Sequence, residues 1–124
     1  MINVIKASGR GFTLVELIAV ILILGIIASI AVPKYFSLME DAQQKALDGG
    51  LAEGQSRIFL HFAKQAINGT KPDDIIYDNA LLGTNAGDFS LSYTDMGDNI
   101  VITVTGLSGN ITGVSKARVI ERPQ

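Results

Sequence analysis

The sequence predicts an α+β protein in which a long N-terminal α-helix packs on a small antiparallel meander of three to four β-strands. Three observations lead to this prediction. The apolar run from Phe12 to Val32 is long enough for a membrane-spanning helix. A helical pattern continues from there to Ile67, and apolar residues alternate with serines and threonines near the C-terminus. The helix therefore has a hydrophobic half, residues 12–33, and an amphipathic half, residues 34–67.

Composition excludes several classes of function. The 124 residues include 12 acidic and 10 basic side chains, for a formal net charge of −2, and no cysteine. Disulfides and thiolate metal sites are therefore excluded, and there is no basic cluster to indicate a nucleic-acid partner. His61 is the single histidine and lacks a second histidine for a metal pair. We expect neither an enzyme nor a cofactor.

Residues 1–11 have the composition of a leader peptide. They contain two basic residues, Lys6 and Arg10, and no acidic one. A secretory signal peptide places its apolar region before the cleavage site, whereas here the apolar run follows Gly11. Cleavage between Gly11 and Phe12 would leave the hydrophobic helix on the mature protein. The alternative is an uncleaved signal anchor whose basic residues fix its cytoplasmic end.

Glu16 is the one acidic residue inside the apolar run. A carboxylate at that depth in a bilayer costs about 2.5–3.5 kcal/mol, so we expect it to have a partner. Cleavage after Gly11 would create an α-amine on Phe12, four residues away on the same helix. The amine of one copy could also pair with Glu16 of a neighbouring copy, and a buried pair of this kind fixes register.

Gly25 and Pro33 both weaken an α-helix, and Pro33 also removes the donor that would bond the carbonyl of Ser29. Two interpretations stay open. Both residue types are common in membrane helices, and Pro33 can simply mark the membrane exit, just before the boundary-type segment Lys34–Phe36. The other interpretation is that the helix loosens between Gly25 and Pro33.

The amphipathic half carries one apolar stripe at helical spacing. Gly49, Gly50 and Gly54 interrupt this half, each costing about 1 kcal/mol relative to alanine in an exposed helix. We therefore expect it to pack against another element, and Asn68-Gly69 to end it. The stripe comprises Leu47, Leu51, Ile58, Phe62 and Ala66.

Residues 68–124 are predicted to form a connector and a C-terminal β-sheet domain. The connector contains a turn at Lys71–Asp74 and a possible short strand at Ile75–Tyr77. Alternating apolar residues then indicate an antiparallel meander with one face on the helical stripe. Its expected strands are Phe89–Tyr93, Ile100–Thr105 and Val114–Ile120.

Asp95 and Asp98 form a calcium candidate, because they supply oxygen ligands in the turn between two expected strands. Their spacing does not match the EF-hand loop, and acidic residues in turns are usually turn formers. Two segments, Asn68–Thr70 and Asn110–Thr112, match the N-glycosylation pattern, which is frequent by chance. We interpret both asparagines as turn residues. The calcium candidate is the one metal site that the sequence offers.

The residues Arg10-Gly11-Phe12-Thr13-Leu14-Val15-Glu16-Leu17, with Gly25, Pro33 and Tyr35 downstream, resemble the N-terminus of type IV pilins and their pseudopilin relatives. The resemblance covers Gly11 to about Phe36. It implies that a prepilin peptidase cuts after Gly11 and methylates the new amino terminus of Phe12. It also implies that subunits wait in the bacterial inner membrane until an assembly ATPase and a platform protein lift them into a helical homopolymer.

Three functions follow as expectations. The first is a structural subunit of an extracellular type IV pilus, and the alternative is a pseudopilin of a type II secretion system in the periplasm. The shared motif does not separate these two. The third is a monomeric, membrane-anchored binding domain whose N-terminal motif is accidental. Nothing in the sequence distinguishes cell adhesion, twitching motility, DNA uptake or conduction, nor a major subunit from a minor one.

Overall fold

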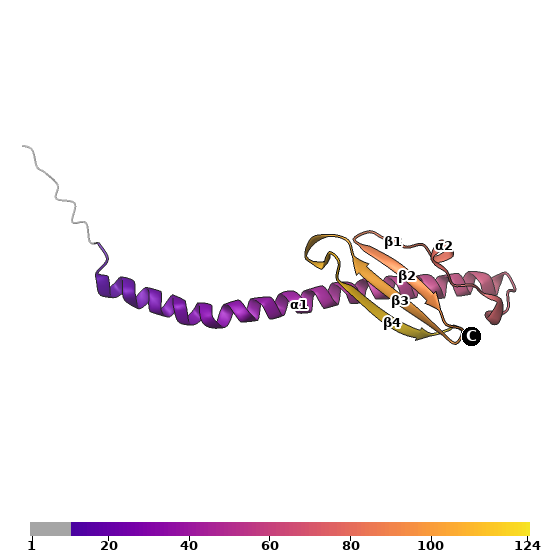
Figure 1. The fold of residues 1–124 in the computed structure, drawn as a ribbon, viewed down its shortest axis with the longest axis horizontal. Helices are drawn as coiled ribbons and strands as arrows, with labels where there is room; N and C mark the ends of the chain where they lie inside the picture. Colours follow the sequence, from indigo (N-terminus) through magenta and orange to yellow (C-terminus); the bar gives the residue numbers. More distant parts are fainter. Residues whose placement is uncertain (1–10) are drawn as a thin grey trace, which may run out of the picture. The chain divides into compact units, whose positions relative to one another are not determined.

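The computed structural model describes residues 11–124, so the predicted leader lies outside the described residues except for Gly11. One α-helix, α1, runs over Leu14–Ile67 and is followed by short helices and a sheet (Figure 1). The long helix and its stop are confirmed, although the helix begins two residues after Phe12. The chain divides at Leu38 into two units, which are described separately.

In the first unit, residues 11–38, α1 is helical throughout, including at Gly25 and Pro33. Every residue of this unit is exposed. The stretch is long and apolar enough to cross a membrane, by length and composition. The hydroxyl of Ser29 donates to the carbonyl of Ile26 at 2.7 Å, which satisfies that hydroxyl inside the helix. Because this apolar surface packs on nothing within its own unit, it needs lipid or other helices to cover it.

The second unit, residues 39–124, contains a four-stranded antiparallel sheet in the order β1-β2-β3-β4, which confirms the predicted meander. Each strand pairs with the next along the chain. The strands are β1 Asn85–Ala86, β2 Phe89–Asp95, β3 Asn99–Gly106 and β4 Ser115–Glu121.

The connector differs from the prediction. Lys71–Asp74 includes a 3₁₀ turn, Pro72–Asp74, and a short helix α2 follows at Asn79–Leu82. The predicted strand at Ile75–Tyr77 is wrong, because this segment pairs with no strand of the sheet. The apolar signal has another cause: Ile75 and Tyr77 are both buried in the hydrophobic core.

The core lies between one face of the sheet and the second half of α1. Leu47, Leu51 and Ile58 are fully buried, as the stripe predicted, and Phe62 is partly buried. Ala66 is exposed, so the predicted stripe stops one turn before the helix does. Helical spacing identifies a face but does not tell where the partner of that face ends. The sheet supplies Leu91, Tyr93, Ile100, Ile102 and Val104.

Two of the glycines have a different role from the predicted interruption. The helix passes through all three, and both Gly50 and Gly54 are buried. A Cβ atom on Gly50 would lie 2.6 Å from Cγ2 of Val104, and one on Gly54 would lie 2.8 Å from Cγ2 of Ile102. Gly49, by contrast, has nothing within 4 Å of such an atom. Gly50 and Gly54 therefore let the helix approach the sheet more closely than any side chain would permit.

The two edges of the sheet differ in whether their outward backbone groups are paired. Along the outer edge of β2, the amide of Leu91 donates to the carbonyl of Thr84 at 2.7 Å, and the amide of Tyr93 donates to Oδ1 of Asn79 at 2.7 Å. The connector thus closes this edge beyond the two-residue β1. No segment among residues 11–124 pairs with the outer side of β4, so β4 is the open edge.

Arg122 fastens the connector to the sheet. Its guanidinium donates to the carbonyl of Ile75 at 2.6 Å and pairs with the carboxylate of Asp95 at 3.1 Å. It also lies 5.3 Å from the centre of the Tyr77 ring, within cation–π range. One side chain after β4 therefore holds the connector and the β2–β3 turn together.

Candidate functional site

The start of α1 is closed by a capping box formed by Thr13 and Glu16. The amide of Glu16 donates to Oγ1 of Thr13 at 3.2 Å, and the amide of Thr13 donates to Oε2 of Glu16 at 3.0 Å. This reciprocal pair satisfies two amides that a helix start otherwise leaves free. This role was not among the predictions from the sequence, although the Thr-x-x-Glu spacing is its recognised signal.

The bond predicted to be cleaved lies directly beside this box. Gly11 and Phe12 are both exposed, and Phe12 is 84% exposed. A Cβ atom on Gly11 would have nothing within 4 Å. The structure therefore brings Gly11, Phe12 and Glu16 together in one short, accessible segment. Cleavage and methylation stay predictions.

The Glu16 carboxylate has one oxygen engaged. Only Oε2 accepts a hydrogen bond from the described residues, and no basic group of residues 11–124 forms an ion pair with Glu16. A carboxylate has about four acceptor positions. Glu16 can thus cap its own helix and still accept a hydrogen bond from an ammonium group of another copy.

Gly25 and Pro33 lie further along the helix and are not part of this segment. A Cβ atom on Gly25 would meet nothing within 4 Å, and the helix is continuous at Pro33. The predicted loosening between the two residues stays a prediction.

The calcium candidate is not assembled as a metal site. Both carboxylate oxygens of Asp95 accept from Arg122, at 3.3 and 3.1 Å, and Oδ1 also accepts from the amide of Gly97 at 2.9 Å. Within the described part of the chain, no three acidic or histidine side chains group closely enough to hold a metal ion. Asp95 thus acts as a turn former with an arginine partner, and Asp98 lies in the turn after it.

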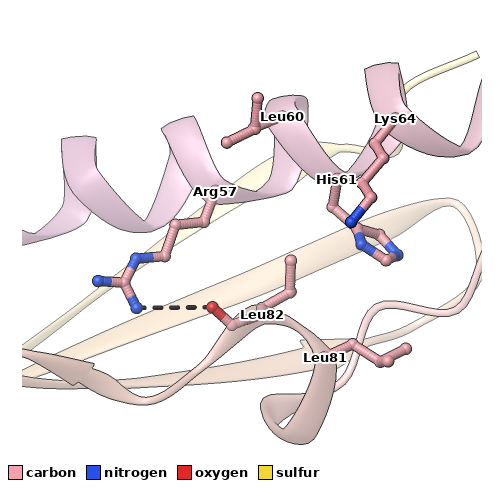
Figure 2. A pocket seen from close by; sticks show the side chains of 6 residues that line it. All are labelled: Arg57, Leu60, His61, Lys64, Leu81 and Leu82. Atoms are coloured by element: carbon pink, nitrogen blue, oxygen red, sulfur yellow. Dashed lines mark hydrogen bonds between the residues drawn. The ribbon is translucent and has the colours of Figure 1, made fainter.

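A hollow of about 200 Å³ lies between α1 and α2 (Figure 2). His61 lines it and packs edge-on against the ring of Tyr77 at 5.8 Å, as expected of a residue at the boundary of the core. Arg57 donates to the carbonyl of Gly83 at 3.0 Å and so joins the two helices. The hollow could not be predicted from the sequence, because nothing local in the sequence shows that α2 folds back onto α1. The lining residues are Arg57, Leu60, His61, Lys64, Leu81 and Leu82.

The sequence of this chain is similar to those of known proteins. Residues 6–32 match the family model of the prokaryotic N-terminal methylation motif. The chain is 35% identical over 78 residues to the type IV narrow pilus major component PilA5 of Thermus thermophilus, covering 63% of this chain and 66% of that protein. It is 43% identical over 49 residues to the type IV major alpha-pilin of Moraxella bovis, covering 40% of this chain and 31% of that protein.

A more distant match is longer. The chain is 26% identical over 117 residues to a fimbrial protein of Pseudomonas aeruginosa, covering 90% of this chain and 76% of that protein. The stronger matches span only about a third to two thirds of the relatives' own length. No solved structure matches the chain significantly.

Proposed function

This chain belongs to the type IV pilin family, and from that premise we propose that it is a structural subunit cleaved after Gly11 that polymerises through the apolar half of α1 into a type IV pilus. The observation that carries the proposal is the apolar half of α1, which is entirely exposed and holds one carboxylate in its first turn. The matched relatives are named as pilus and fimbrial proteins, which favours a pilus over the pseudopilus alternative.

The exposed helix accounts for both stages of the proposed life cycle. Before assembly, the bilayer of the inner membrane covers the apolar side chains of residues 12–33. During assembly, the same side chains exchange lipid for the helices of other copies, so little apolar surface ever meets water. The prepilin peptidase, the platform protein and the assembly ATPase are the partners that this transfer requires.

Glu16 supplies the register in this proposal. Two opposite charges in an apolar setting attract strongly, and either one left alone is costly. Cleavage gives Phe12 a charged amine, which the uncleaved chain lacks. The free oxygen of Glu16 accepts a hydrogen bond from the ammonium group of a neighbouring copy, while the other oxygen keeps its hydrogen bond from the Thr13 amide. Polymerisation therefore requires processing.

Two substitutions separate the charge of Glu16 from its capping role. Glu16→Gln removes the charge, but glutamine also closes a capping box. Thr13→Ala keeps the charge but removes the hydroxyl acceptor, which weakens the helix start by about 1 kcal/mol. We expect Glu16→Gln to insert into the membrane without forming filaments, and Thr13→Ala to form them.

The measurement is mass spectrometry of filaments sheared from cells that carry each variant. It reports the amount of subunit, cleavage after Gly11 and methylation of Phe12 together. Normal filament yield from Glu16→Gln would contradict the role of the charge. A protein that still begins at Met1 and stays monomeric in the membrane would refute the whole proposal. Confinement to the periplasm, with a requirement for exoenzyme export, would favour the pseudopilin instead.

A further inference from the structure

The hollow between α1 and α2 has apolar walls and a basic rim. We call four of its lining residues the basic hollow: Leu60, His61, Lys64 and Leu81. Leu60 is 72% exposed and Leu81 is 57% exposed. No acidic group among residues 11–124 lies within 4.0 Å of the Lys64 ammonium. Such a surface suits a partner that offers an apolar side chain next to a carboxylate.

Arg57 also lines the hollow, but its guanidinium is already engaged by other groups of the same chain. Arg57 pairs with Glu53 at 2.9 Å and also donates hydrogen bonds to backbone carbonyls, including that of Asn85 at 2.9 Å. It therefore serves the fold. Lys64 stays available at the rim, close to His61 (Figure 2).

The opposite edge of the sheet presents the complementary chemistry. We call Asp98, Val119 and Glu121 the acidic edge. Val119 is 61% exposed, and both acidic residues are exposed. Asn99 is the sheet partner of Glu121, and the amide of Arg122 donates to the carbonyl of Asp98 at 2.9 Å, so the three residues gather at the end of β4. No basic side chain among the described residues forms an ion pair with either acid.

The two surfaces lie on opposite sides of the second unit, near the same end of the sheet. The sheet order puts β4 at the far edge from β1, and α2 covers the β2 side. Gly50 of α1 faces Val104, and Gly54 faces Ile102. Moving along β3 from Val104 toward Asn99 thus follows α1 toward its C-terminal end, where the hollow lies.

We propose that the acidic edge of one copy docks into the basic hollow of the next copy in the filament. Val119 then covers the exposed leucines, and Glu121 or Asp98 pairs with Lys64. A helical filament needs two different surfaces that meet head to tail, because a self-complementary patch would close a dimer. This inference rests on the proposed pilus function, and it adds a lateral contact between the sheet domains to the contact made by the apolar helices.

Cross-linking tests the contact directly, because the chain has no cysteine of its own. The test uses filaments of the full chain carrying Leu81→Cys together with Val119→Cys, treated with a short bismaleimide. We expect a ladder of covalent multimers on a denaturing gel. The control pair is Leu81→Cys with Leu107→Cys, since Leu107 is 54% exposed but follows the other end of β3.

Several outcomes would overturn the docking. One is the absence of a ladder from Leu81→Cys with Val119→Cys, and another is an equal ladder from the control pair. A third is the formation of dimers by Leu81→Cys alone, which would indicate a two-fold contact. If the unaltered chain formed no filaments at all, the proposed function itself would fail. The two failures are therefore distinguishable.

Charge reversal gives a second, independent measurement. Lys64→Glu would place like charges opposite each other, and we expect the yield of sheared filament to fall about tenfold or more. Glu121→Lys should do the same, and the two reversals together should restore the yield. Unchanged yields from both single variants, or no recovery in the double variant, would count against the pairing. The melting temperature of each detergent-solubilised subunit checks that its fold is intact.

Discussion

Two adjacent glycines in α1 give the sharpest test of how the helix meets the sheet. Gly49 and Gly50 share the same helix and the same propensity cost, but only Gly50 faces the sheet. Replacing either by alanine gains about 1 kcal/mol of helix propensity. At Gly49 nothing lies within 4 Å of the new atom, so we expect the full gain.

At Gly50 the same substitution should destabilise the fold. The new Cβ atom would lie 2.6 Å from Cγ2 of Val104 and 3.2 Å from Cγ of Phe89. Val104 is fully buried and β-branched, so its methyl cannot swing aside without moving β3. Overpacking of this kind costs about 1–3 kcal/mol. Both variants share the propensity gain, so the overpacking cost alone separates them. We therefore expect the free energy of unfolding of Gly50→Ala to be about 1–3 kcal/mol lower than that of Gly49→Ala.

Thermal unfolding of the detergent-solubilised protein, followed by near-ultraviolet circular dichroism of the buried tyrosines, measures this difference. For a unit of this size, 1 kcal/mol corresponds to about 4–8 °C in melting temperature. Gly54→Ala, whose new atom would lie 2.8 Å from Ile102, should behave like Gly50→Ala. Equal stabilisation by Gly49→Ala and Gly50→Ala would refute the reasoning, because the helix could then move away from the sheet at no cost.

Three further predictions concern the polar contacts of the sheet domain. Arg122→Ala should lower the free energy of unfolding by about 2–3 kcal/mol, because several charged hydrogen bonds are lost together, and denaturant titration would show this. The hydrogen bond from Lys116 holds the pKa of Asp48 below its ordinary value of 3.8. The pair therefore contributes to the free energy of unfolding above about pH 4, and this contribution disappears as the pH falls through the folded-state pKa of Asp48. The melting temperatures of the unaltered chain and Lys116→Met should therefore converge on acidification. Tyr77→Phe should leave stability unchanged or raise it by about 1 kcal/mol, because the buried Tyr77 hydroxyl has no partner among the described residues; a clear loss on denaturant titration would point to a hydrogen bond through water.

The elements that could be predicted are those with a local periodic signal. The second half of α1 and the strands from Phe89 onward follow from spacing in the sequence, because burial of one face repeats every 3.6 or 2 residues, whereas the first half follows from the length of its apolar run. The Ile75–Tyr77 segment carries the same signal but forms no strand. Burial alone requires only that Ile75 and Tyr77 point inward, whereas a strand also needs a neighbour with free backbone groups.

The contacts that could not be predicted are those between distant segments. Nothing near Gly50 in the sequence indicates that Val104 will press against it, and nothing near Arg122 identifies the carbonyl of Ile75 as its acceptor. The capping role of Glu16 was accessible, because Thr13 lies three residues before it. Glu16 therefore combines two roles that its sequence context indicates separately, a costly charge in an apolar segment and an acceptor for the backbone amide of Thr13.

The closed edge of β2 limits what can happen when subunits are crowded together. A sheet with two open edges can add copies at both ends without limit, which is the route to cross-β fibrils. Here the carbonyl of Thr84 and the side chain of Asn79 occupy the amides at one edge. Accidental strand pairing through β4 therefore stops once two molecules have joined.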